Sequence, residues 1–305
     1  MAERHLILGM GEVLWDLLPD GPRLGGAPAN FTVMAARLGN HAVLLSRLGR
    51  DELGGEAVER LKQLSADASV LQLDEEHETG RVTVAFEGGQ PQYTIHQPAA
   101  WDFLALTDKW LELAEKADAL CFGSLAQRSE ASRQTIQTLV EKAPASCVRV
   151  FDVNLREPFY SAEIIQQSLE LASVLKMNDT EAPLVLSLLG LPVEESCSLK
   201  SGAERILREF PSLQMVAVTR GGHGSLLATR AESDEHPGIS VKVADTIGAG
   251  DAFTAAMTHS LLRGASLAKV NEAGNCWGAW VASQAGGMPE LPNAARPELG
   301  AENEN

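Results

Sequence analysis

The chain alternates short apolar segments, typical of strands, with longer segments whose apolar residues recur at helical spacing. Strands are expected at residues 6–10, 42–48, 119–122, 148–153, 174–177, 215–219 and 225–228. Helices are expected at residues 29–38, 129–143 and 251–263, each of which ends next to a glycine or a proline. Strands that alternate with crossover helices predict an α/β fold built on a parallel sheet.

Residues 12–26 and 79–102 interrupt this alternation. The second stretch contains two strand-like segments, at 79–86 and 92–96, separated by a glycine pair, which is typical of a hairpin. A hairpin inserted between crossover units predicts a small sheet that projects from the main domain. Such a sheet could close over a ligand as a lid.

Composition excludes several classes of protein. With 305 residues and 45% apolar content, the chain can bury a large core. Lys plus Arg number 25 and Asp plus Glu 41, so the net charge of -16 argues against nucleic acid or an anionic membrane as the main partner. The four cysteines form no Cys-x-x-Cys pair, so neither a zinc site nor a disulfide framework is predicted. The apolar run at 6–10 is too short for a signal-peptide core, so a cytoplasmic location is expected.

The segment Asp-Thr-Ile-Gly-Ala-Gly-Asp-Ala-Phe at 245–253 follows an alternating segment at 239–243, interpreted as a strand, and runs into an expected helix. Gly248 and Gly250 let the backbone approach a ligand, and the first N–H groups of the helix lack partners within it, so the turn can bind an anion. Asp251 beside this turn suggests a base that takes a hydroxyl proton while the N–H groups stabilise a transferring phosphoryl group. A helix cap explains Asp251 about equally well from this segment alone.

Two further loops should lie at the carboxyl ends of parallel strands, where open α/β sheets bind ligands. The pair Gly25-Gly26 lets N–H groups reach a polyol and Asn30 can bond one of its hydroxyls, although Asn30 could merely start a helix. Asp152, Asn154 and Arg156 would share one side if the extended geometry of the preceding strand continued. A solvated strand end also accommodates these three side chains.

Two more polar clusters follow strands. Asn178 and Glu181 have the spacing of a capping box, which is the leading interpretation of this segment. If Thr180 is the cap instead, Pro183 falls in the first turn and the other two side chains are free to face a ligand. The glycines of the segment 219–224 can approach nucleotide phosphates closely, or can simply form a tight hairpin.

These segments, in this order, resemble the PfkB family of carbohydrate kinases, also called the ribokinase-like family, over essentially the whole chain. The matching segments are Gly9-Met-Gly11-Glu12 with Asp16, Gly25-Gly26 to Asn30, Leu48-Gly-Arg-Asp51 to Gly54, Asn178 to Glu181, Thr219 to Gly224, and Asp245 to Phe253, the last being the most specific. The resemblance implies a doubly wound, mainly parallel sheet flanked by helices. It also implies one kinase domain over residues 1–305, with a β lid built from about 12–26 and 79–102.

The resemblance assigns roles to individual residues. It implies Asp251 as the catalytic base, with the N–H groups of Gly248, Ala249 and Gly250 as an anion hole. The sugar would be bound by Asp16, Gly25, Gly26, Asn30, His96, Asp152, Asn154 and Arg156, and ATP by Asn178, Thr219, Gly221, Gly224 and Asn275. Glu181 would act on Mg²⁺ through water, while Asp245 and Ser283 would hold a monovalent cation such as K⁺. The cation site departs from the family pattern, because Ile247 replaces a common threonine.

Within the family, residues 26–30 and 152–156 look most like fructokinases, so transfer of the ATP γ-phosphate to fructose is the expected reaction. 2-Keto-3-deoxygluconate kinase, or another sugar or nucleoside kinase of the family, is the alternative. Arg156 could pair with the carboxylate of an acid substrate, and His96 stands where a lid arginine is frequent in bacterial fructokinases.

Other classes of protein fit less well. A non-catalytic sugar-binding protein would keep the loop at 26–30 but lose Asp251 or its glycines, which are all present. A dinucleotide-binding oxidoreductase lacks its third glycine at position 14, and no Gly-x-x-x-x-Gly-Lys-Ser/Thr sequence of a P-loop kinase occurs. Because exposed edges of a small sheet often pair, a homodimer through the lid is a further expectation.

Overall fold

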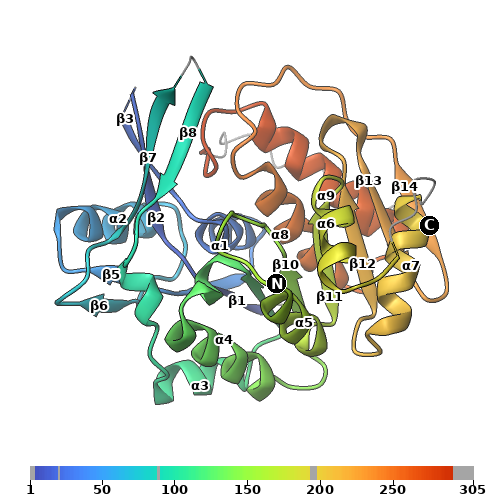
Figure 1. The fold of residues 1–305 in the computed structure, drawn as a ribbon, viewed down its shortest axis with the longest axis horizontal. Coiled ribbons are helices and arrows are strands. Elements are labelled where there is room, and N and C mark those ends of the chain that lie inside the picture. Colours follow the sequence, from blue (N-terminus) through green and yellow to red (C-terminus); the bar gives the residue numbers. More distant parts are fainter. Residues whose placement is uncertain (1–3, 20, 88–89, 193–197, 291–305) are drawn as a thin grey trace.

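The computed structural model describes residues 4–19, 21–87, 90–192 and 198–290, and Figure 1 shows their arrangement. Its main sheet has eight strands, in the order β14 (Ser233–His236), β13 (Ser225–Thr229), β12 (Met215–Thr219), β11 (Val174–Asn178), β10 (Val148–Asp152), β9 (Ala119–Gly123), β1 (Leu6–Met10) and β4 (His41–Leu45). Neighbours from β4 to β12 are parallel. The pairs β12–β13 and β13–β14 are antiparallel. The predicted mainly parallel α/β sheet is therefore confirmed.

Helices cover both faces of this sheet. One face packs against α1 (Ala27–Arg37), α2 (Glu52–Gln63), α8 (Ala249–Leu261) and α9 (Leu267–Ala282). The other packs against α3 (Asp108–Ala114), α4 (Glu130–Lys142), α5 (Ala162–Leu171), α6 (Glu181–Leu188) and α7 (Leu199–Glu209). Short 3-10 turns occur at η1 (Ala100–Phe103), η2 (Leu125–Arg128) and η3 (Gly221–His223). Successive strand residues enter opposite cores, as Ile7 and Leu8 do in β1, so the strands must be apolar on both sides.

A second sheet of four strands projects beside the main one, at the upper left of Figure 1. Its order is β3 (Gly21–Gly25), β2 (Leu14–Leu18), β7 (Gly80–Glu87) and β8 (Gln90–Ile95). The two stretches that interrupt the alternation therefore supply the predicted small sheet. The glycine pair expected at its turn lies outside the described residues.

The strand expected at 42–48 is two strands, which belong to different sheets. β4 ends at Leu45, and the chain then leaves the main sheet to form β5 (Arg47–Gly49), which pairs with β6 (Gln72–Asp74). The carbonyl of Ser46 accepts the N–H of Gln72 at 3.0 Å, so the pairing with the β6 segment begins directly after β4.

The strand expected at 239–243 is also wrong. These residues form no regular pairing within the described part of the chain, and Val243 is 60% exposed. The N–H groups of Ala244 and Asp245 bond to the carbonyl of Ala282 at the end of α9. Alternation alone does not make a strand, because a sheet edge must also lie within reach.

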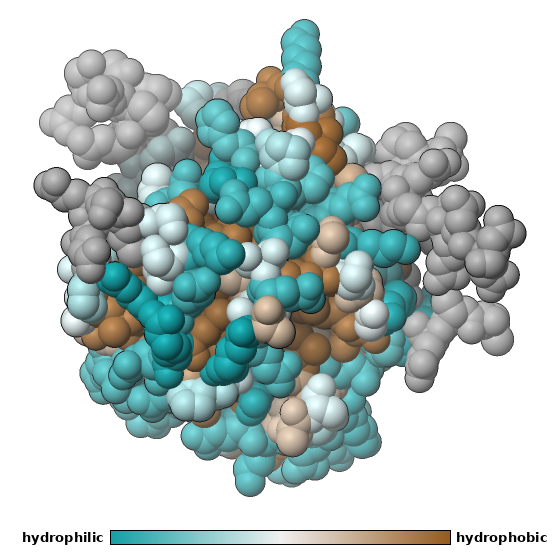
Figure 2. Space-filling model, turned by 90° about the vertical axis from the view of Figure 1, so that its right-hand side faces the viewer, coloured by the Kyte–Doolittle hydropathy of each residue, from teal (hydrophilic) through white to brown (hydrophobic). Residues whose placement is uncertain are grey.

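The surface of the described residues fits this layered core. No helix among them combines the length and the apolar character needed to cross a membrane. Figure 2 views the right-hand side of Figure 1 and shows hydrophilic residues over much of that face, with apolar residues visible between them. A mixed surface of this kind is usual for a globular domain.

The junction of the two sheets leaves no room for a side chain at Gly80, the first residue of β7. A Cβ there would lie 2.3 Å from the ring nitrogen of Trp101, which is fully buried, and 2.8 Å from the carbonyl oxygen of Val13. We expect Gly80→Ala to lower the free energy of unfolding by about 1–3 kcal/mol, the usual cost of overpacking, as measured by urea denaturation.

Gly55→Ala in α2 is the matched control, because an added carbon there meets nothing within 4 Å. This change should raise the free energy of unfolding by about 0.5–1 kcal/mol, since alanine favours a helix more than glycine does. A Gly80→Ala protein as stable as the wild type would contradict the packing described for this junction.

Candidate active site

Asp251 lies in the first turn of α8, next to the carboxyl ends of β10 and β11. Gly248 caps this helix with a φ of 74°, a left-handed conformation that favours glycine. A Cβ on Gly248 would lie 2.5 Å from the Cα of Gly287, so the turn is packed closely against the chain that follows α9. The first N–H groups of a helix have no partners within it, so this turn can bind an anion beside Asp251. The N–H of Ala249 bonds to the carbonyl of Thr246 at 3.3 Å and must give up this long bond to join the other N–H groups of the turn.

Asn30 connects the start of α1 to the start of α8. Its Nδ2 donates to Oδ2 of Asp251 at 2.7 Å, although the two residues are far apart in the sequence. Asn30 is 3% exposed, and its Oδ1 has no partner among the described residues. Gly26 caps α1 with a φ of 106°. The structure therefore brings the predicted sugar loop and the predicted base into one site.

A buried ion pair lies beneath Asp251. Nζ of Lys176 is 3.0 Å from Oδ1 of Asp152, and the hydroxyl of Thr254 donates to Oδ2 of Asp152 at 2.8 Å. Both charged side chains are less than a tenth exposed. A Cβ on Gly250 would lie 3.0 Å from Nζ of Lys176, so the ammonium group sits against the anion-binding turn. Sequence analysis missed Lys176, although a lysine inside an apolar strand is itself a signal.

The neighbours of Asp251 tune its acidity in opposing directions. Burial raises the pKa of Asp251 to about 6 and the charge of Asp152 adds to this, whereas Lys176, the bond from Asn30 and Arg156 lower it. Burial lowers the pKa of Lys176, but nearby carboxylates, Asp152 first, raise it above its ordinary value, so this side chain is a cation. Asp251 is therefore mostly ionised at pH 7 with a pKa close to the working pH of a general base.

Asp16 and Arg156 lie on the side of the site toward the small sheet. Burial raises the pKa of Asp16, and the charge of Arg156 is the largest influence that lowers it. A Cβ on Gly25 would lie 2.9 Å from Oδ2 of Asp16, so Gly25 lets this carboxylate approach the loop that begins α1. Arg156 also lowers the pKa of Asp251, which places its charge near both carboxylates.

The extended geometry expected across 152–156 is wrong. Asn154 has a φ of 42°, so the chain turns immediately after β10. Asp152 is buried and bonded within the protein, whereas Arg156 is exposed and donates to the carbonyl of Leu155. The three polar side chains have different surroundings and do not form one row.

His96 lies at the base of the small sheet. Its Nε2 is 3.0 Å from the hydroxyl of Thr83, and its carbonyl accepts a bond from Arg128 at 2.9 Å. Arg128 makes two further bonds of 2.8 Å to Asp102, and its guanidinium carbon lies 3.9 Å from the ring centre of Trp101. This cluster, which sequence analysis did not anticipate, anchors the small sheet to the main domain.

Asn178 and Glu181 make the reciprocal contacts of a capping box. Oδ1 of Asn178 accepts the N–H of Glu181, and Oε2 of Glu181 accepts the N–H of Asn178, both at 2.8 Å. Oε1 of Glu181 accepts the N–H of Leu155 at the same distance. Thr180 is the N-cap of α6 and Pro183 lies in its first turn, as the alternative supposed. Asn178 and Glu181 are nevertheless bonded to each other, so they are not both free to face a ligand; Asn178 keeps its amide N–H donors and Glu181 its remaining lone pairs.

Thr219, Gly221 and Gly224 lie at the turn between the antiparallel strands β12 and β13. The N–H of Arg220 bonds to the carbonyl of Gly224 at 2.7 Å, which closes the hairpin that one of the two interpretations predicted. A Cβ on Gly224 would lie 1.9 Å from the carbonyl oxygen of His236. Packing alone therefore requires this glycine, and a contact with nucleotide stays a prediction.

Asn275 lies in α9 and supports the same hairpin. Its Nδ2 donates to the hydroxyl of Ser225 at 2.7 Å and to the carbonyl of Asn271 at 2.8 Å. These bonds hold the first residue of β13 rather than Asp251. Asn275 therefore acts on the position of the glycine turn.

Asp245, which is expected to hold a monovalent cation, already forms an ion pair with Arg23. Its Oδ2 accepts Nη1 of Arg23 at 3.0 Å and the N–H of Gly286 at 3.1 Å, and its Oδ1 accepts the N–H of Ile247 at 3.0 Å. The hydroxyl of Ser283 is bonded to the end of α9. K⁺ fits this arrangement poorly, because Arg23 neutralises the carboxylate. Within the described ranges, no three His, Cys, Asp or Glu side chains are grouped to hold a metal ion.

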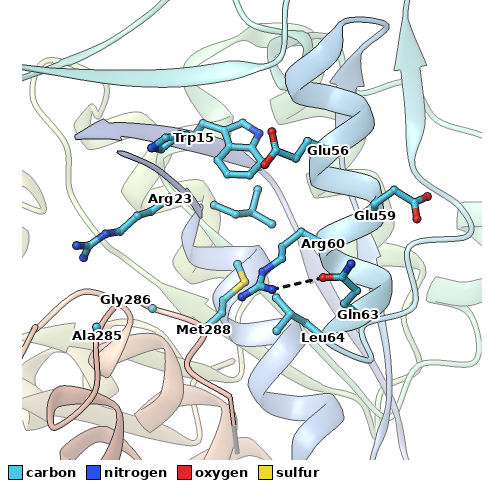
Figure 3. Close-up of a pocket in the computed structure, with 13 residues that line it drawn as sticks. Trp15, Arg23, Glu56, Glu59, Arg60, Gln63, Leu64, Ala285, Gly286 and Met288 are labelled. Atoms are coloured by element: carbon cyan, nitrogen blue, oxygen red, sulfur yellow. Dashed lines mark hydrogen bonds between the residues drawn. The ribbon is translucent and has the colours of Figure 1, made fainter. Parts of the chain in front are cut away.

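A cavity of about 480 Å³ lies beside this site rather than within it. Figure 3 shows this cavity between Trp15 and Arg23 of the small sheet on one side and Glu56 and Arg60 of α2 on the other, with Gly286 on the neighbouring turn. None of the side chains predicted for the active site lines this cavity. The predicted active-site side chains therefore lie outside this cavity, and the candidate active site is the cluster around Asp251.

Comparison with known proteins gives a consistent result. Residues 22–294 match the family described as pfkB family carbohydrate kinase. The chain is 31% identical to a fructokinase of Escherichia coli over 271 residues, 83% of each protein. An uncharacterized sugar kinase from Pyrococcus horikoshii in complex with ATP has a TM-score of 0.77 at 28% identity, over 92% of this chain and 94% of that one. Fructokinase from Vibrio cholerae O395, with fructose, ADP and calcium ion bound, gives 0.77 at 26% identity, over 93% and 94%.

Opposite changes of charge beside Asp251 should move its pKa in opposite directions. Lys176→Met removes a positive charge, so the acidic limb of the kcat/KM profile should move above pH 6. Asp152→Asn removes a negative charge, so the limb should move below pH 6. The measurement is kcat/KM as a function of pH.

The double variant Lys176→Met/Asp152→Asn is the control, because it removes both charges and leaves neither buried alone. Its acidic limb should lie between those of the two single variants. If both single variants keep the wild-type limb, Asp251 is not the group that titrates.

Proposed function

Because the chain belongs to the pfkB family of carbohydrate kinases, we propose that it transfers the γ-phosphate of ATP to a hydroxyl group of fructose. One observation carries this proposal. Asp251 is a carboxylate in the first turn of α8, beside an anion-binding turn, and it is bonded to Asn30 of the predicted sugar loop. The sugar approaches Asp251 from the loop at 26–30, and ATP approaches from the hairpin at 219–224.

In this proposal Asp251 is the general base. It accepts the hydroxyl proton as the sugar oxygen attacks the γ-phosphorus in line, while the bond from phosphorus to the ADP oxygen breaks. The N–H groups of Gly248, Ala249 and Gly250 bind the transferring phosphoryl oxygens. Lys176 adds a fixed positive charge beneath this turn, and positioning with charge stabilisation accounts for most of the rate.

Mg²⁺ enters with ATP in this proposal. The ion usually binds through phosphate oxygens, several waters and one or two carboxylates, and when bound it neutralises the charge of the phosphates. Glu181 is next to Asn178 and has lone pairs left for a water of such an ion. Since Arg23 already pairs with Asp245, no step is assigned to a monovalent cation.

The charges on the sugar side favour a neutral sugar over a sugar acid. The carboxyl groups of Asp16, Asp251 and Glu12 all lie within electrostatic reach of Arg156. The carboxylate of 2-keto-3-deoxygluconate would meet the carboxylates of Asp16 and Asp251 and one exposed arginine, and like charges at short range cost free energy. Fructose carries no charge and can use Asp16, Asp251 and Arg156 as hydrogen-bond partners.

The small sheet acts as a lid in the same proposal. Closing it over the sugar, with His96 at its base, would exclude water and limit hydrolysis of ATP. A homodimer through its edges and a cytoplasmic location follow from the sequence as further proposals. The net charge of -16 speaks against nucleic acid or an anionic membrane as a partner.

A screen of fructose, ribose, tagatose, glucose, adenosine and 2-keto-3-deoxygluconate with ATP and Mg²⁺ tests the proposal. We expect the highest kcat/KM for fructose, by at least about tenfold over each other acceptor, because misplaced hydroxyls leave buried polar groups unpaired. ADP release without sugar is the baseline. A preference for 2-keto-3-deoxygluconate would contradict the substrate proposal, and no release above baseline with any acceptor would indicate a binding protein.

A further inference from the structure

Glu12 is a buried carboxyl group to which the mechanism gives no task. It follows β1 and is 3% exposed. Its Oε1 accepts the N–H of Ala27 at 3.2 Å, and a Cβ on Gly26 would lie 2.4 Å from its carbonyl oxygen. Both the side chain and the backbone of Glu12 therefore contact the start of α1.

The two carboxyl oxygens of Glu12 differ in their hydrogen bonding. Oε2 is buried and has no hydrogen-bond partner in the part of the chain that the structure describes. A buried carboxylate with an unbonded oxygen is costly, because the charge has lost its water without gaining a donor. The neutral acid lowers this cost, because a buried O–H without a partner costs less than a buried charge, and Oε1 still accepts the N–H of Ala27.

Three elements bring titratable groups toward Glu12. Burial is the largest influence on the pKa of Glu12, which is raised to about 7. The charge of Asp251 in α8 also raises this pKa, whereas the N–H groups of Glu12 and Ala27 and the charge of Arg156 after β10 lower it. Cys121 of β9 is the third such group, and burial raises the pKa of its thiol so far that it stays neutral. Glu12 is therefore mostly neutral below pH 7 and mostly ionised above it.

We propose that Glu12 is a positioning residue, which as a neutral acid holds the first turn of α1 so that Asn30 meets Asp251. Ala27, its hydrogen-bond partner, is the first residue of that turn. The N–H of Asn30 bonds to the carbonyl of Gly26 at 2.9 Å, so a shift of this loop moves the Asn30 side chain. Ionisation of Glu12 strengthens the bond from Ala27 but leaves a charged Oε2 buried without a donor, so the start of α1 must shift to bring in a donor, which weakens sugar binding. This inference rests on the proposed function, because it takes the loop as the sugar site.

The test measures KM and kcat with D-fructose and ATP as the pH rises. For the wild type we expect the fructose KM to increase about fivefold between pH 7 and pH 8, the effect of one ionisation near pH 7, with kcat and the ATP KM unchanged. Glu12→Gln cannot ionise and keeps the Oε1 acceptor, so its fructose KM should stay at the low-pH value. Glu12→Ala loses the bond to Ala27 and should have a raised fructose KM at every pH.

Glu115→Gln is the matched control, because it removes an exposed carboxylate at the end of α3. Its fructose KM should rise with pH as in the wild type. A wild-type fructose KM that does not change between pH 7 and pH 8 would overturn the inference. A rise that persists in Glu12→Gln would also overturn it.

The stability of the substrate-free protein separates this inference from the identity of the sugar. The folded pKa of Glu12 lies above the ordinary value of 4.5, so the wild type loses stability as the pH rises from 4.5 to about 7. Glu12→Gln removes this loss and should gain in melting temperature relative to the wild type over the same range. If fructose is not the acceptor but this gain occurs, only the substrate proposal fails, and the KM series is repeated with the accepted sugar. Absence of the gain contradicts a neutral buried Glu12.

Discussion

Asp251 is a carboxylate that the fold buries at the start of α8 while keeping it ionisable near neutral pH. Burial raises its pKa, and Lys176 together with the bond from Asn30 offsets part of that rise, which leaves the pKa at about 6. Without these partners its pKa would be higher, and a smaller fraction of the group would be able to accept a proton at pH 7. The partners come from β11 and α1, so the main sheet and two helix starts must all be in place before the base works.

The chain carries a net charge of -16, yet its family transfers a phosphate from ATP. Positive charge close to the phosphate can outweigh the net negative charge of the protein, because surface charges more than about 8–10 Å away are screened at ordinary ionic strength. Lys176 lies directly beneath the anion-binding turn and is fixed there by Asp152. The first N–H groups of α8 add a partial positive charge at the same place. An acidic protein can thus bind a polyanion through a few buried groups.

Patterns local in the sequence could be predicted, and contacts between distant segments could not. Apolar alternation predicted the helices α1, α4 and α8 and the strands of the main sheet except β14, and the spacing of Asn178 and Glu181 indicated the capping box. Asp152 and Lys176 are direct neighbours in the β10–β11 register, but nothing in either strand encodes that register. The bond from Asn30 to Asp251 joins residues 221 positions apart. For the same reason the segment 239–243 alternates as a strand does and still finds no sheet edge.

The central claim is that Asp251 removes the proton from the acceptor hydroxyl. It is tested most directly by a single turnover of ATP and fructose on Asp251→Asn, with both affinities measured by calorimetry. Asparagine matches the shape of aspartate but cannot accept the proton, so the rate should fall by roughly 10²- to 10⁴-fold while both ligands still bind. A variant that binds both ligands and transfers the phosphoryl group at nearly the wild-type rate would contradict the claim.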